Sequence, residues 1–190
     1  MISDDNNVNI NARLRQSYHH GDLRTALIDA GLSLLASGPA DALSLRGMAR
    51  AAGVSATAVY RHFPDKAALL AALAAEGLVR LGEAQRQAAE AAGGGLAGFI
   101  ATGRAYVRFA LANPALFRLA VAAPGDAAAP DTEPGALLRA NAAAHLGLPP
   151  DHPDVSVLAL RVWSRAHGLA MLMLDGQIPA SDAIIDQVIG

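Results

Sequence analysis

The chain has 190 residues, of which 53% are hydrophobic and 17% charged, a balance typical of a folded protein and not of a disordered one. Its lack of cysteine excludes disulfides and thiolate metal sites, and its net charge of −2 is not that of a strongly basic nucleic-acid binder. No stretch approaches the roughly 18 uninterrupted apolar residues of a membrane span. The N-terminus is acidic and Asn-rich, unlike a secretory signal, so we expect a cytoplasmic protein.

The small net charge hides an asymmetry along the chain. Residues 11–66 carry seven basic and four acidic side chains, whereas residues 67–190 carry eight basic and eleven acidic ones. A basic segment at 11–66 followed by an acidic segment at 67–190 is consistent with a protein in which the first segment binds phosphate groups and the second has another function. Shifts of this size are common, so the asymmetry is supporting evidence only.

Every element that the sequence predicts is a helix. Residues 1–17 lack helical periodicity and are expected to form a flexible arm, and residues 123–135 a mobile loop. Helices are expected over 22–37, 45–52, 56–62, 66–92, 96–112, 114–122, 136–146 and 153–174, with a last one after Ser181. Ser44, Ser55 and Asp65 are the expected N-caps. The sequence therefore predicts an all-α fold of about nine helices.

Residues 44–63, SLRGMARAAGVSATAVYRHF, have the pattern of a helix-turn-helix. Gly53 stands where two helices crossing steeply need a residue that tolerates positive φ. The apolar residues of both helices share one face, which leaves Thr57, Tyr60 and Arg61 on the outer face of the second helix. On spacing alone, an ordinary helical hairpin remains an equal alternative.

The wider string from Tyr18 to Leu73 resembles the DNA-binding domain of the tetracycline-repressor (TetR) family. The most specific matches are Gly53-Val54-Ser55, Val59-Tyr60-Arg61-His62-Phe63 and Asp65-Lys66-Ala67-Ala68-Leu69. The resemblance implies a three-helix DNA-binding domain over residues 18–66, after the arm at 1–17. Residues 67–190 would then form a helical ligand-binding and dimerisation domain.

The resemblance also implies which residues touch double-stranded DNA. Ser44, Arg46 and Lys66 would hold phosphates, Tyr60 and His62 would brace the sugar-phosphate backbone, and Ala56 and Thr57 would face base edges. The full expected set is Ser44, Arg46, Ser55, Ala56, Thr57, Tyr60, Arg61, His62 and Lys66. Arg13 and Arg15 on the arm could enter a minor groove, or could serve only as solubilising charge.

The resemblance further implies that the chain forms a homodimer and responds to a small-molecule effector. The helix Val155–Leu174 and the last helix are the expected dimer contact, through Val155, Leu158, Val162, Leu169, Leu172, Met173, Ile184, Ile185, Val188 and Ile189, although a monomer core would give the same pattern. Trp163, His167 and Gly168 resemble a Trp…His-Gly signature of one TetR subgroup, with structural packing as the alternative. Candidate effector contacts are Phe99, Arg104, Tyr106, Phe109, Phe117, Trp163, His167 and Met171.

Other classes of protein find less support in the sequence. There is no nucleophile elbow, phosphate-binding loop or zinc-helix signature, so we expect neither catalytic residues nor a metal or other cofactor. The expected function is a ligand-responsive repressor on a palindromic operator, since repression is the family's usual mode. The alternative is a helical scaffold or interaction protein without specific DNA binding.

Overall fold

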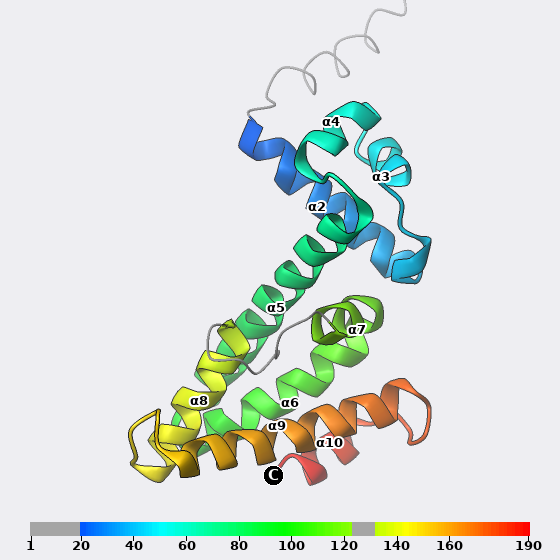
Figure 1. Ribbon diagram of the computed structural model, residues 1–190. Helices are drawn as coiled ribbons and strands as arrows, with labels where there is room; N and C mark the ends of the chain where they lie inside the picture. Colours follow the sequence, from blue (N-terminus) through cyan, green and yellow to red (C-terminus); the bar gives the residue numbers. More distant parts are fainter. Residues whose placement is uncertain (1–19, 123–131) are drawn as a thin grey trace, which may run out of the picture.

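The computed structural model describes residues 20–122 and 132–190, and this part of the chain forms nine α-helices, one short 3₁₀ helix and no strand. The all-α prediction is thus confirmed (Figure 1). Arg13, Arg15 and the rest of the predicted arm lie outside the described residues, as does most of the predicted loop 123–135.

Four short elements gather at one end of the molecule. They are α2 (His20–Ser37), η1 (Ala40–Ala42), α3 (Leu45–Ala51) and α4 (Ala56–His62), and they pack on the beginning of α5 (Lys66–Ala91). Their shared core is Leu27, Leu35, Leu43, Leu45, Met48, Ala49, Val59, Phe63, Leu69, Leu73 and Leu116. Because Leu116 lies far along the chain, this core also ties the first elements to the body.

The long helix α5 runs from this end into the body, where five more helices pack (Figure 1). These are α6 (Gly95–Ala112), α7 (Pro114–Ala122), α8 (Glu133–Leu146), α9 (Pro153–Leu174) and α10 (Asp182–Val188). The predicted domain boundary at residue 66 falls at the first turn of α5, which continues without a break. Its Leu69 and Leu73 are fully buried in this first core, whereas its Leu81 lies in a second core. The second core consists of Leu81, Tyr106, Val107, Ala110, Phe117, Ala166, Leu169, Ala170, Met173, Ile185 and Ile189.

Most predicted helix limits agree with the structure to within two residues, and α8 is the exception. It begins at Glu133 and not near Ala136, because Thr132 caps it by accepting a hydrogen bond from the Gly135 N–H at 3.2 Å. Pro134 fits the first turn, where its missing N–H costs nothing. Ser181 precedes α10 as predicted but makes no side-chain cap bond.

Helix α9 is apolar on two sides, which corrects the predicted dimer face. Val155, Leu169 and Met173, expected to meet a partner, are buried in the protomer's own core, as are Ile185 and Ile189 after it. The helical spacing of apolar residues predicts that α9 has an apolar face, but it does not show whether the protomer's own core or a partner covers that face. The outer side of α9 exposes Leu172, which belongs to the predicted face, at 40%, together with Val157 and Leu160, which do not, at 47% and 58%.

By length and composition α9 is also the one described helix that could cross a membrane, with a mean hydropathy of 1.2 over its most apolar stretch. Only 28% of that stretch is buried within the protomer. One such helix is weak evidence for a membrane span, and within the protomer the observation identifies an apolar surface on α9.

Candidate nucleic-acid interface

Helix α3 begins at a capped N-terminus. The extended Ser44 places its Oγ 3.0 Å from the Gly47 N–H, which donates to it, and this bond satisfies one of the helix's free amides. Leu45, Met48 and Ala49 point into the core, so the opposite face of the helix is turned to solvent. Ser44 and Arg46 are exposed on that side.

The turn between α3 and α4 depends on Gly53. Its φ of +67° is left-handed, which lets the Val54 N–H donate to the Ala49 carbonyl at 2.9 Å and closes the end of α3. No atom lies within 4 Å of a Cβ built on Gly53, so the backbone conformation, and not space, selects glycine here. This confirms the role that the sequence predicts for Gly53.

Helix α4 is anchored by one residue and exposes the predicted contact residues. Ser55 caps it through the Ala58 N–H at 3.2 Å, and Val59 is completely buried beneath it. Thr57, Tyr60 and Arg61 are exposed, Tyr60 at 48%. The helix therefore presents a small outer surface with few hydrogen-bonding groups, as its alanines imply.

The start of α5 is held against the 3₁₀ helix by Lys66. Its Nζ donates to the Asp41 carbonyl at 2.7 Å, a contact that the sequence does not reveal. Asp65 caps α5 by accepting from the Ala68 N–H at 2.8 Å. Lys66 thus has a structural bond in addition to the phosphate contact predicted for it, and two of its N–H groups remain for DNA.

Unpaired positive charge collects on this end of the molecule. Arg46, Arg50 and Arg61 are exposed, and none forms an ion pair with a carboxylate in residues 20–122 or 132–190. Arg50, absent from the predicted contacts, stands in the last turn of α3. Exposed guanidinium groups without partners are suited to phosphate, the group that dominates affinity for DNA.

The structure brings four of the predicted effector contacts together in the body. The Tyr106 hydroxyl lies 2.9 Å from His167 Nδ1 and 3.4 Å from Trp163 Nε1, and Phe117 packs edge-on against the Tyr106 ring. The indole N–H can only donate, so the Tyr106 oxygen accepts from it. With His167 neutral and its proton on Nε2, the Tyr106 hydroxyl donates to Nδ1, which gives the hydroxyl hydrogen an acceptor.

Burial fits the same assignment. It lowers the pKa of His167 and raises the pKa of Tyr106 to about 12, so both side chains stay neutral near pH 7. The void beside them, which Gln85 and Thr102 also line, measures about 20 Å³. A void of that size holds a water molecule and not an effector. The cluster is packed core in this conformation.

The remaining predicted effector contacts lie elsewhere. Arg104 does not face this cluster: its Nε donates to the Ile189 carbonyl at 2.9 Å, and Arg108 beside it pairs with Asp182 at 2.7 Å. The hydrogen bond to Asp182 raises the pKa of Arg108. Both arginines therefore fasten α6 to α10. Phe99 belongs to a third core cluster, while Phe109 and Met171 are half-buried at the edge of the second.

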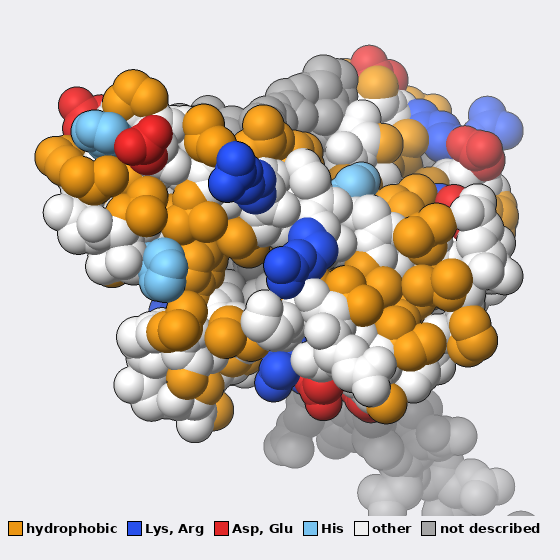
Figure 2. All heavy atoms as spheres, turned by 90° about the horizontal axis from the view of Figure 1, so that it is seen from below, with side chains coloured by type: hydrophobic (Ala, Val, Ile, Leu, Met, Phe, Trp, Pro, Cys, Tyr) orange, Lys and Arg blue, Asp and Glu red, His pale blue; other side chains and the backbone are white. Residues whose placement is uncertain are grey.

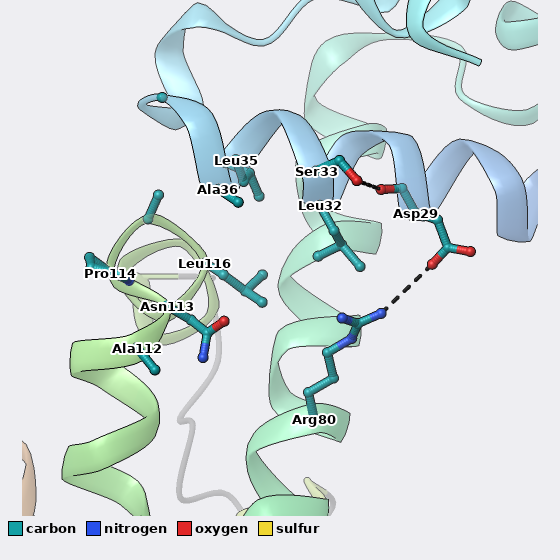
Figure 3. A pocket seen from close by; sticks show the side chains of 12 residues that line it. Asp29, Leu32, Ser33, Leu35, Ala36, Arg80, Ala112, Asn113, Pro114 and Leu116 are labelled. Carbon is teal, nitrogen blue, oxygen red and sulfur yellow. Dashed lines mark hydrogen bonds and ion pairs between the residues drawn. The ribbon is translucent and has the colours of Figure 1, made fainter. Parts of the chain in front are cut away.

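A cleft of about 530 Å³ separates α2 from the turn between α6 and α7 (Figure 3). Leu32 and Leu116 project into it from its two sides, and Arg80 of α5 reaches across one edge to Asp29 of α2 at 3.7 Å. Both charged side chains are well exposed, so the ion pair contributes little to stability.

No three His, Cys, Asp or Glu side chains in the described ranges lie close enough together to hold a metal ion. What the geometry provides instead is a helix-turn-helix with an exposed second helix and unpaired arginines around it. The fold and this interface define a DNA-binding regulator of transcription.

Comparison with known proteins identifies the family. Residues 27–73 match the family model for bacterial regulatory proteins of the tetR family, and residues 99–189 match that for the tetracyclin repressor-like C-terminal domain. The chain belongs to the TetR family.

Solved structures agree in fold. A protein of unknown function from Rhodococcus sp. RHA1 is 37% identical with a TM-score of 0.73, over 92% of this chain and 93% of that one. A TetR transcriptional regulator from the same organism is 22% identical with a TM-score of 0.52, over 90% and 94%. No curated protein sequence matches the chain.

Proposed function

We propose that the protein is a ligand-responsive repressor that binds a palindromic operator as a homodimer. The observation that carries the proposal is the exposed face of α4, with Thr57 and Tyr60 turned outward beside the unpaired Arg46 and Arg61. The arginines would hold phosphates, while the outer face of α4 enters the major groove. The protein would bind its operator in the cytoplasm and would not catalyse a reaction.

The outer side of α9 supports the homodimer. Large apolar side chains that gather on one side of a helix are normally covered, yet Val157, Leu160 and Leu172 lie open to solvent, with Val188 of α10 at 37%. Between them stand Arg161, Ser164 and Gly168, and a Cβ on Gly168 would meet nothing within 4 Å. Packing within the protomer therefore does not explain the glycine, whereas close approach of a partner's α9 does. Whether Trp163, His167 and Gly168 also mark a TetR subgroup stays a prediction.

Two connections between the body and the DNA-binding end support a response to an effector. Leu116 of α7 is buried in the first core, and α5 joins both ends as one helix. A ligand that moves α7 or tilts α5 would change the distance between the two α4 helices of a dimer. It would lower DNA affinity by the difference in its own affinity for the two conformations.

Selection of genomic DNA fragments on the purified protein tests the proposal. We expect enrichment of a two-fold symmetric site whose affinity, followed by fluorescence anisotropy, falls steeply with salt. Arg46→Ala and Tyr60→Ala should each weaken binding at least tenfold, whereas Val79→Ala, at an exposed position in the body, should not. If the protein retained all DNA fragments equally, or if Arg46→Ala and Tyr60→Ala both bound DNA with unchanged affinity, the alternative of a helical scaffold protein would be favoured.

A further inference from the structure

A groove of about 410 Å³ lies on the side of the body opposite the DNA-binding end. Figure 2 faces this side and shows orange apolar side chains around a hollow, with blue basic side chains at its edge. The apolar lining is Leu96, Phe99, Ile100, Leu158, Val162 and Ile189. This volume is in the range of small-molecule sites, unlike the void beside Tyr106.

The charged side chains of the groove all have one sign. Arg161 and Arg165 line it one helical turn apart on α9, His145 lines it from α8, and no carboxylate side chain is among the lining residues. Arg165 Nη1 donates to the carbonyls of Val188 and Gly190 at 3.0 and 3.2 Å. Arg161 has neither a hydrogen bond nor an ion pair within residues 20–122 and 132–190. An unpaired guanidinium therefore stands at the rim of an apolar trough.

We propose that this groove binds an amphipathic carboxylate, an acyl or aryl body with one acid group. The apolar body would cover the exposed part of the trough, where Leu96 is 56% accessible. The carboxylate would accept two parallel hydrogen bonds from Arg161, with Arg165 adding positive charge. We identify this carboxylate as the effector of the repressor, and that identification rests on the proposed function.

Two features of the groove favour this chemistry over others. A neutral apolar molecule would leave Arg161 without a partner at the rim, and a cation would be repelled by two arginines. A compact anion such as inorganic phosphate would pair with Arg161 but leave the apolar walls wet. A ligand with both an apolar body and an acid group uses both parts of the site, and a carboxylate matches the planar fork of a single guanidinium.

Calorimetric titration of the full chain, without DNA, tests the groove. The probes are octanoate, 1-octanol and octylamine, which share a chain and differ in charge, used below the concentrations at which they form micelles. We expect octanoate to bind at least tenfold more tightly than either of the other two. Arg161→Ala should remove that preference, and Arg161→Glu should transfer it to octylamine. Arg118→Ala, an equal change of charge on α7 away from the groove, should leave it intact.

Equal binding of octanoate and octanol, binding unchanged in Arg161→Ala, or no binding of any probe would each overturn the proposal. It would also be overturned if Arg161→Ala altered the molecular mass in solution and not octanoate binding, since the groove would then be a subunit contact. DNA affinity of each variant without ligand is measured in parallel. If the wild-type protein showed no specific DNA binding, the proposed regulator function would be contradicted. The octanoate titration would still decide whether the groove binds an amphipathic carboxylate.

Discussion

Tyr106 holds two partners at once, accepting from Trp163 Nε1 and donating to His167 Nδ1. A second proton on His167 would turn Nδ1 into a donor facing the hydrogen of Tyr106. The hydroxyl would have to turn away, and it would then face the indole N–H and the imidazolium with its oxygen alone. Protonation of His167 therefore removes the acceptor of the Tyr106 hydrogen, in addition to the effect of burial, which lowers the pKa of His167.

The first prediction follows from the lowered pKa of His167. As pH falls below about 6.5, the unfolded chain takes up this proton before the folded chain does, so the free energy of unfolding decreases. Above that pH both states are neutral and the contribution is constant. We expect wild type to lose more stability than His167→Gln between pH 7.5 and 5.5 in urea denaturation. Equal losses in the two proteins would mean that His167 is not part of the pH dependence.

The second prediction concerns Lys66, whose Nζ is bonded to the Asp41 carbonyl. Lys66→Met should weaken DNA binding and also lower the free energy of unfolding by about 1 kcal/mol, the usual net value of one hydrogen bond. Tyr60→Ala should weaken DNA binding alone, because its side chain is half exposed and forms no hydrogen bond within the described residues. Urea denaturation combined with anisotropy separates the two effects. A Lys66→Met protein of unchanged stability would show that the bond contributes nothing.

At the scale of elements, the sequence predicts the helix-turn-helix well because its signals are local. Ser44, Ser55 and Asp65 each cap a helix through an amide three residues ahead, a distance that the sequence alone determines. The start of α8 was missed although Thr132 and Pro134 carry the same kind of signal, because the alanine-rich stretch before it reads as loop. The 3₁₀ helix, by contrast, is secured by Lys66 from 25 residues away, and no local pattern indicates it.

The third prediction isolates the turn between α3 and α4. Gly53→Ala should cost about 1–2 kcal/mol of stability, because an L-residue pays that much for left-handed backbone. Gly38→Ala is the matched control: its Cβ position is equally empty and its φ is not positive, so it should not destabilise the protein. The midpoint of urea denaturation measures both. Similar midpoints for the two variants would contradict the role assigned to the turn.

At the scale of the whole molecule, sequence reasoning reaches less far. The predicted effector contacts are spread over three core clusters, and the groove joins α6, α8, α9 and the residues after α10, which only the folded chain brings together. Likewise, the helical spacing alone does not show which apolar residues of α9 are buried in the protomer's own core and which lie on its exposed outer side. Contacts over such distances in the sequence depend on how helices cross, and no local signal encodes that.

The fourth prediction tests the outer face of α9. Leu160→Glu should convert a dimer to a monomer in light scattering, because the charge would lie in the centre of the proposed contact. Val79→Glu, on an equally exposed valine of α5, should leave the mass unchanged. The monomer should also bind the full operator at least a hundredfold more weakly than the dimer does, since the second α4 no longer contributes. A Leu160→Glu protein with the mass of wild type would place the subunit contact elsewhere.

The chain contains one tryptophan, and it stands in the body with its indole N–H on Tyr106 and its ring 5.6 Å from that of His167. Its emission is therefore a built-in optical signal from a single known position, free of any contribution from the DNA-binding end. When operator DNA is added, a change in that emission would report motion transmitted through α5 and α7. The communication between the two ends can be followed in unlabelled protein, in real time.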